Sequence, residues 1–397
     1  MRLKPVISPM ALIAVLAVSC VKTERLPDGA EDRYPITFTT AVGSIDTKAM
    51  IEGNVFPTDE EFATFAYWLK EGGWDDNKNA AQLYIPLGEA DSRTVVSYDE
   101  TLNCWSTEIP YYWPHSGSLT FFAFHPYDMD DVTFSVEEGI TIAGRDIAGD
   151  KDQQKDIMVA EAAKDQTANS APGENGNLTG FTGVPTVFHH TMSRVVGFHI
   201  RTDEDYTSGA GDYGGTKLEF LLNSIKIKNV FVKASFKSGP EPDADYYGEW
   251  FDYSGADAVY SWYDNDNGLA IVYCESATDE KTKVPDDNIR IKEGDNTESK
   301  LAGSALILPQ RFNDPYYADN HDACIELTYT VRYKFPDKSE KSRRIVREIS
   351  LAEIHRGQDS SWPMGKDISY SFTIGLDRIL WEPELEDRET EIYGDDL

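Results

Sequence analysis

Several segments of the chain alternate apolar and polar residues with a period of two, which is the pattern of β-strands. The longest such run is 325–335, and 368–376 repeats it near the C-terminal end of the chain. Shorter segments at 36–40, 62–68 and 118–124 are strand-like and rich in aromatic residues. Alternation places one face of a strand on a core and the other in water. Because helical periodicity is weak throughout, the pattern predicts an all-β fold built from sandwiches.

One turn signal is strong. The cluster Asp264–Gly268 separates apolar runs at 260–263 and 269–273, and Asn267-Gly268 can supply the positive φ angles of a tight turn. We therefore expect a β-hairpin here. The same cluster suggests a calcium loop, but with Gly268 at the sixth position the twelfth is Cys274 and not the required Glu.

A change of composition suggests where the chain divides. Residues 164–183 are rich in Ala, Gly, Asn, Thr and Ser, and strand-like runs resume at Pro185. The run 187–200 could belong to either domain. The acidic C-terminal end reads as a solvated tail. The expected organisation is a signal peptide 1–19, a flexible tether 20–33, an N-terminal β-sandwich domain 34–184, a C-terminal β-sandwich domain 185–381 and an acidic tail 382–397.

The N-terminal residues have the features of an export signal. Two cations at Arg2 and Lys4 precede the apolar stretch Met10–Val18, which is too short to span a bilayer. The ending Leu16–Cys20 resembles the bacterial lipobox, in which the Cys thiol is acylated and becomes the new N-terminus. We therefore predict lipidation at Cys20, the alternative being an ordinary secretory signal with an incidental Cys. Several acyl chains together would anchor the protein to a membrane.

Charge excludes one class of partner. The 397 residues include 37 Lys and Arg against 69 Asp and Glu, a net charge of −32. Nucleic acid needs a basic stripe and is not an expected partner. Besides Cys20 there are three Cys, an odd number that cannot form a complete disulfide framework. A Cys274–Cys324 bridge is open, and buried thiols are the preferred interpretation.

Candidate chemistry is weak. His189, His190 and His199 are close in sequence, but adjacent residues of a strand point to opposite faces and no Cys or Glu has a supporting ligand spacing. No nucleophile elbow, zinc motif or phosphate loop is present. We predict no metal, no cofactor and no enzymatic activity. Sugar-stacking tryptophans are a further candidate, although core packing suits them better: Trp68, Trp74, Trp105, Trp113, Trp250 and Trp262.

Several segments together resemble the fimbrillin family, the type V pilus subunits and related lipoproteins of gut and oral Gram-negative bacteria. The likeness spans nearly the whole mature chain. His125 stands where an aromatic residue is usual in the family, and His190 falls on the signature His. The segments that carry the resemblance are Ile36–Thr39 with Thr47–Ala49, Tyr112–Pro114 with Leu119–Tyr127, Asp156–Ala160, Val187–Arg194, Leu306–Gln310 and Trp362–Lys366.

The resemblance implies two tandem transthyretin-like β-sandwich domains and export as an outer-membrane lipoprotein displayed at the cell surface or in a fimbrium. In polymerising members an Arg-directed protease removes the first strand, and a strand of a neighbouring subunit fills the groove. Arg33 is the best placed cleavage candidate here. The strand-exchange candidates are Ile36 and Phe38 in the first strand, and Ile368, Tyr370, Phe372 and Ile374 in the donor.

The resemblance also implies the partners. These are other fimbrial subunits, outer-membrane lipid through acylated Cys20, and host or bacterial surface ligands. It leaves open whether the subunit belongs to the stalk, the tip or the anchor. The alternative function is a non-polymerising surface lipoprotein that binds glycans through exposed aromatic residues.

Overall fold

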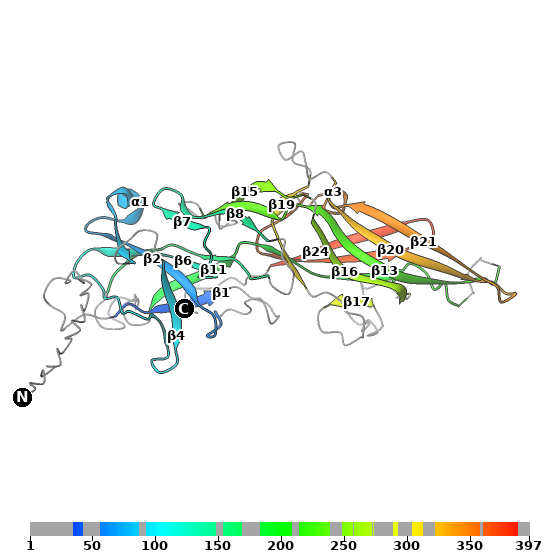
Figure 1. Ribbon diagram of the computed structural model, residues 1–397, viewed down its shortest axis with the longest axis horizontal. Coiled ribbons are helices and arrows are strands. Elements are labelled where there is room, and N and C mark those ends of the chain that lie inside the picture. The colour runs from blue at the N-terminus through cyan, green and yellow to red at the C-terminus, as the bar shows by residue number, and fades with distance from the viewer. Residues whose placement is uncertain are drawn as a thin grey trace, which may run out of the picture.

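The computed structural model describes thirteen stretches of the chain and shows an elongated molecule, with the N-terminal half at one end and the C-terminal half at the other (Figure 1). The described residues are 35–42, 56–86, 93–147, 154–168, 183–208, 214–238, 248–256, 258–271, 273, 289–292, 304–312, 322–357 and 360–387. Strands make up most of the described residues, so the predicted all-β class is confirmed. Cys20, Arg33 and the segment Thr47–Ala49 lie outside the described residues.

The N-terminal half is built around one closed sheet. Its nine strands run in the order β10-β6-β9-β11-β1-β5-β4-β2-β3, and a further pairing of β2 with β6 closes seven of them into a ring. The strands are β1 (Phe38–Val42), β2 (Phe62–Leu69), β3 (Gln82–Ile85), β4 (Thr94–Asp99), β5 (Cys104–Thr107), β6 (Ser118–His125), β9 (Met158–Ala160), β10 (Ala163–Gln166) and β11 (Val184–His190).

This ring differs from the expected pair of separate facing sheets, because β2 bonds to both β4 and β6. The transthyretin-like arrangement stays a prediction. The division expected at residue 185 also falls inside a strand. Residues Val184–His190 of β11 pair with β1 and β9 in the ring, and the chain enters the C-terminal sheets at Ser193.

A second sheet joins the two halves. Its order is β15-β14-β8-β7, and two of its strands come from each side of the expected division. The strands are β7 (Val132–Ser135), β8 (Gly139–Asp146), β14 (Lys233–Lys237) and β15 (Glu249–Ser254). Its apolar face packs on the outer face of the ring, where Phe65 and Phe124 meet Phe236 and Trp250 in one buried cluster.

Two sheets face each other in the C-terminal half. One has the order β17-β12-β23-β24, with β18 also paired to β12, and the other has the order β16-β13-β20-β21. The first contains β12 (Ser193–Thr202), β17 (Ile289–Lys292), β18 (Ala305–Ile307), β23 (Lys366–Ile374) and β24 (Ile379–Asp387). The second contains β13 (Lys217–Val230), β16 (Ala258–Ile271), β20 (Cys324–Lys334) and β21 (Glu340–Ser350).

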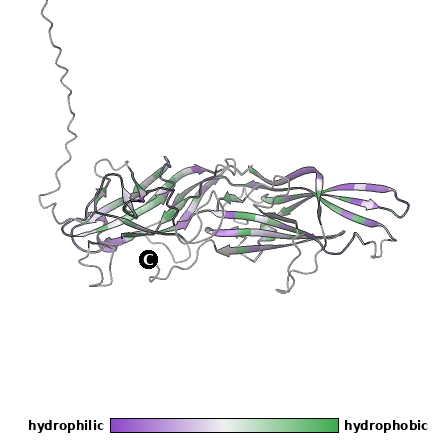
Figure 2. Ribbon diagram, turned by 90° about the horizontal axis from the view of Figure 1, so that it is seen from below, coloured by the Kyte–Doolittle hydropathy of each residue, from purple (hydrophilic) through white to green (hydrophobic). Residues whose placement is uncertain are grey.

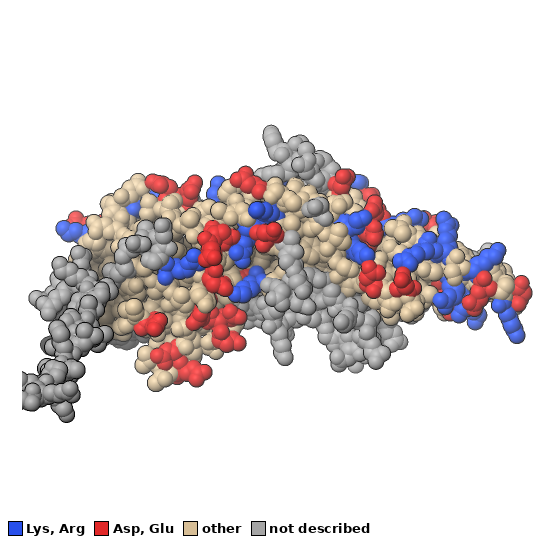
Figure 3. All heavy atoms as spheres, viewed as in Figure 1, with Lys and Arg blue, Asp and Glu red and all other residues tan. Residues whose placement is uncertain are grey.

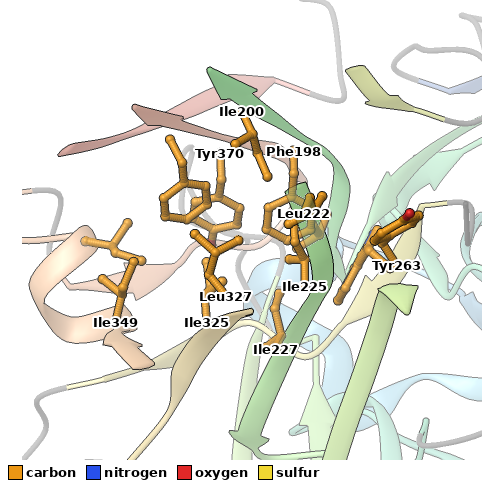
Figure 4. Close-up of a cluster of buried hydrophobic side chains, with 14 of the residues drawn as sticks. Phe198, Ile200, Leu222, Ile225, Ile227, Tyr263, Ile325, Leu327, Ile349 and Tyr370 are labelled. Carbon is orange, nitrogen blue, oxygen red and sulfur yellow. The ribbon is translucent and has the colours of Figure 1, made fainter. Parts of the chain in front are cut away.

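The core between these two sheets follows from the alternation seen in the sequence. Phe198 and Tyr370 project from the first sheet towards Leu222, Ile325 and Leu327 of the second (Figure 4). Hydrophobic and hydrophilic residues alternate along many strands, and hydrophilic ones prevail at the narrow end of the molecule (Figure 2). The remaining elements are short: β19 (Gln310–Arg311), β22 (Ser361–Trp362), α1 (Trp74–Asn77), the 3₁₀-helix η2 (Lys78–Ala80) and α3 (Leu351–Ile354). No helix in the described part of the chain is long and apolar enough to cross a membrane.

Two sequence expectations are wrong in their details. The hairpin at Asp264–Gly268 is absent, because β16 runs from Ala258 to Ile271 and this cluster forms a wide bulge opposite Asn223. The Asn223 side-chain amide donates to the carbonyls of Asn265 and Asp266 and so holds the bulge.

The expected acidic tail also begins too early. β24 continues to Asp387 as a partner of β23. Ile379, Trp381 and Leu385 pack against the core, whereas Glu382 and Glu384 occupy the outward positions between them. The period of two therefore persists through the acidic residues.

Candidate functional site

The first strand, with its surrounding groove, is the candidate site, because its removal would open the ring. β1 pairs in parallel with β11 over its whole length, from Phe38 opposite Val184 to Val42 opposite Phe188. On its other edge Phe38 is opposite Trp105 of β5. β11 and β5 do not pair with each other in the described ring, so β1 is the strand that joins them.

The residues just before β1 are also hydrogen-bonded to the ring through their backbone. The Ile36 amide donates to the Tyr111 carbonyl at 2.8 Å, and the Val184 amide donates to the Thr37 carbonyl at 2.7 Å. Pro35 forms a bridge with Tyr112. Since Pro35 lacks an amide donor and sits at the start of the strand, it costs the sheet no interior bond.

The groove floor under β1 is aromatic. Ile36 and Phe38 are 2% and 3% exposed and belong to the cluster inside the ring. The Phe38 ring stands edge-on to Phe62 and Phe121, with centroid distances of 5.8 Å in both cases. Both predicted first-strand residues are therefore buried. Without β1 this floor would face water, and burying it again is worth roughly 25 cal/mol per Å² of apolar surface.

Gly183 lets the two parallel strands approach closely. Its φ is +109°, and a Cβ there would lie 2.6 Å from the carbonyl carbon of Phe38 and 2.8 Å from the Thr39 amide nitrogen. Only glycine accepts both the dihedral angle and the contact. The residue closes the segment 164–183 that the composition had suggested as a linker.

The structure places the predicted donor residues in an interior strand. Ile368, Tyr370, Phe372 and Ile374 are all buried, and β23 pairs with β12 on one edge and β24 on the other. β23 could leave only by dismantling the core. The edge strand is β24, which has the same alternation and a single partner among the described strands.

Tyr370 is also fixed by its hydroxyl. The indole Nε1 of Trp362 donates to this oxygen at 2.7 Å, and the His355 Nε2 lies 2.9 Å away. Burial raises the pKa of the Tyr370 hydroxyl, so it stays neutral. The arrangement is a buried polar network that holds β23 in place, a role that the alternation pattern gave no means of predicting.

Two buried polar contacts involve segments that carry the family resemblance. His190 at the end of β11 lies 2.8 Å from Asp156, and both side chains are buried. Arg194 on β12 binds Asp367 on β23 through two bonds, from Nε at 2.8 Å and from Nη2 at 2.5 Å. Sequence reasoning missed Asp156, Arg194 and Asp367 as partners because the pairs are non-local.

The other two histidines of the candidate metal group, His189 and His199, have different neighbours. His189 contacts the half-exposed Glu161 at 3.0 Å, and His199 lies on β12 opposite Ser371. Within the described residues no three His, Cys, Asp or Glu side chains converge as a metal site would require.

Cys324 and most of the candidate tryptophans are buried in the described part of the chain. Cys324 is buried with a free thiol, and burial raises its pKa; the candidate partner Cys274 is outside the described residues. Five of the six tryptophans proposed for sugar stacking are buried, and Trp68 is half-buried with its Nε1 bonded to the Ser116 carbonyl. The preferred interpretation, core packing, is confirmed for these five.

A family profile described as fimbrillin-like matches residues 71–387. The chain belongs to the fimbrillin-like family. This confirms the resemblance found in the sequence. No curated protein matches the chain at a significant level.

Solved structures of fimbrial proteins resemble this fimbrillin-like chain. A fimbrial protein from Bacteroides vulgatus matches with a TM-score of 0.55 and 16% identity, over 89% of this chain and 99% of that one. A tip fimbrial protein from Porphyromonas gingivalis matches with a TM-score of 0.37 and 8% identity, over 89% and 99% of the two chains. The first likeness supports the fold, and the family match supports a fimbrial or adhesion subunit.

Proposed function

We propose that this protein is a fimbrial structural or accessory adhesion subunit, exported as a lipoprotein through Cys20 and assembled by strand exchange. The observation that carries the proposal is the position of β1 between β11 and β5 over an aromatic floor. An added strand in that place would gain backbone bonds on two edges and seat alternate side chains in the ring. Arg33, two residues before the Pro35 bridge, is the proposed cleavage site. A cut there leaves β1 in the mature chain but frees its N-terminal end, so in this proposal the donor strand displaces β1 from the groove.

We further propose β24 as the donor in place of β23. Its inward residues Ile379, Trp381 and Leu385 match the apolar positions that Ile36, Phe38 and Val42 fill in the ring. As an edge strand it can leave while β12 and β23 remain paired. Pro383 and the outward glutamates keep its free edge from unspecific pairing in the monomer.

The two domains are part of the same proposal. We place the division between His190 and Ser193, where the chain passes from the ring to the C-terminal sheets. β14 and β15 then return to complete the joining sheet. A transthyretin-like origin of both units is proposed from the family resemblance.

The test is cleavage of the soluble protein by an Arg-specific protease. We expect loss of the segment up to Arg33 and the appearance of SDS-resistant oligomers, and neither with Arg33→Ala. A protein cut cleanly at Arg33 that remains monomeric would contradict the polymerising function. Incorporation of labelled palmitate in cells, abolished by Cys20→Ala, tests the lipid anchor independently.

A pair of variants tests the donor. In cleaved protein Trp381→Asp should abolish SDS-resistant oligomers, because a charge cannot enter the aromatic groove. Leu380→Asp, one residue away on the exposed face, should leave them intact. Equal effects of the two substitutions would exclude β24 as the donor.

A further inference from the structure

The narrow end of this acidic molecule carries a group of cations. Between Arg332 and Arg347 there are seven Lys and Arg against two Asp and Glu, in a chain whose net charge is −32. Lys and Arg side chains gather over β20 and β21 on the face shown in Figure 3. β21 is the edge of its sheet, and most of its residues are exposed.

Three of these cations have carboxylate partners. Arg332 and Lys334 contact Glu219, and Arg344 contacts Asp266. Within the described residues the others show no ion pair, and neither does Arg378 in the turn before β24. We name these the cationic edge: Lys338, Lys341, Arg343, Arg347 and Arg378.

The cationic edge borders a groove. Lys341, Arg343 and Arg347 alternate along β21 and so share one face, with successive positions of the alternation roughly 7 Å apart. Arg347 and Arg378 line a hollow of about 220 Å³ between β21 and the start of β24, beside Tyr329 and Trp381. Glu348, Glu353 and Asp377 also line it, so the excess of positive charge lies along the exposed strand and not in the hollow. Charges on an edge strand commonly prevent unspecific pairing. That role does not account for Lys338 and Arg378, which lie off the strand.

The N-terminal half offers the complementary charge. Its described residues from Phe56 to Ala168 carry 18 Asp and Glu against six Lys and Arg, and acidic side chains cluster on its flank in Figure 3. A hollow of about 320 Å³ there is lined by Asp59, Glu60 and Glu61 together with Tyr98 and Tyr127. Burial and the neighbouring Asp59 raise the pKa of Glu60, as expected where carboxylates crowd together.

This hollow lies near the candidate groove. Tyr98 of β4 is opposite Trp105 of β5, which is opposite Phe38 of β1. Two strand spacings, about 10 Å, therefore separate the acidic hollow from β1. A subunit held there would have its C-terminal half beside the groove that β1 fills.

We propose that the cationic edge docks on the acidic hollow of a second copy of this chain. The partner is inferred from charge complementarity, since each copy carries both surfaces in different halves and screening at about 10 Å keeps them from neutralising each other at 0.1 M salt. The inference rests on the proposed fimbrial function. In that function the docking would bring two subunits together before strand exchange. The contact itself is reversible and needs no cleavage.

The experiment uses uncleaved protein carrying Arg33→Ala, so that strand exchange cannot contribute. Sedimentation at 50 and 500 mM salt should show association that weakens as salt rises. Arg343→Glu with Arg347→Glu should weaken it by roughly tenfold or more, because like charges then face each other. Asp59→Lys with Glu60→Lys should do the same. Lys70→Glu with Lys78→Glu, an equal charge change away from both surfaces, should not.

The decisive arm mixes the two reversed variants. Each is self-repelling, but in a 1:1 mixture every reversed surface meets its complement, and association should return. Failure of the mixture to associate overturns the proposal, as does a wild-type protein that is monomeric at low salt. Heparin binding by such a monomer, lost on reversal of Arg343 and Arg347, would instead assign the surface to an anionic glycan. SDS-resistant oligomers report strand exchange separately, so the two ideas can fail independently.

Discussion

At the scale of single residues, the molecule depends on a few buried polar groups within aromatic and aliphatic cores. Arg194 and Asp367 join β12 to β23 with both side chains almost fully buried. His125 lies in the ring beside Phe56, at a position where the family usually has an aromatic residue. Each group is tolerated because it has a defined partner, and each should be sensitive to loss of that partner.

Arg194→Met should destabilise the protein by about 3–5 kcal/mol, because it leaves the Asp367 carboxylate buried without its counter-charge. Arg344→Met is the matched control. Its pair with Asp266 is exposed on both sides, and pairs of that kind contribute about 0–1 kcal/mol. Denaturant unfolding measures both. Similar losses in the two variants would show that burial does not set the value of the Arg194 pair.

His125 should make stability depend on pH. Burial lowers the pKa of its imidazole, although a bond to the Glu61 carbonyl opposes this. The unfolded chain therefore binds a proton that the folded chain does not, starting near the ordinary His pKa of about 6.5. Stability should be fully present above that value and fall as pH drops below it. His125→Phe should flatten the pH dependence of unfolding between pH 7 and 5. An unchanged slope would contradict a buried neutral His125.

At the scale of elements, β1 depends on its contact with β11 as much as on its own side chains. The Gly183→Ala substitution should displace β1, because the new methyl group would collide with the Phe38 backbone and the φ of +109° is strained for alanine. Gly357→Ala is the control, with φ +95° but open space around the added carbon. Hydrogen exchange of residues 36–42 should rise sharply in the first variant only. Protection of β1 that survives Gly183→Ala would show that the close approach is not required.

The elements also show where sequence patterns succeed. β20 and β23 were predictable because burial on one face imposes a period of two. β2 and β6 are buried on both faces, so they were recognisable only as short runs rich in apolar and aromatic residues. β24 was cut short in the prediction because glutamates at outward positions look like a solvated run, although Leu385 continues the inward set. The bulge in β16 looked like a hairpin turn because both need Asn, Asp and Gly. The parallel β1–β11 pair and the closed ring join distant segments, and no local pattern encodes them.

At the scale of the whole molecule, the joining sheet makes the two halves one body. β14 and β15 follow the C-terminal strand β13 in the chain, but β14 pairs with β8 of the N-terminal half and carries β15 on its other edge. The Trp250 indole donates to the Thr191 carbonyl at 2.6 Å, at the point where the chain passes from ring to C-terminal sheets. Leu306 adds a further tie, because its backbone amide and carbonyl both bond the Gln154 side chain. Strand pairing, a buried apolar cluster and side-chain bonds thus connect the two halves.

Because the joining sheet connects the two halves, we expect them to unfold together. Phe236 is fully buried between them against Trp250, so Phe236→Ala should cost about 3–5 kcal/mol. The loss should appear equally in hydrogen exchange of β6 and of β13, because opening either half exposes the shared cluster. Phe251→Ala, on the half-buried face of β15, should have a much smaller effect on both. Destabilisation confined to one half would mean that the two halves unfold separately despite the joining sheet.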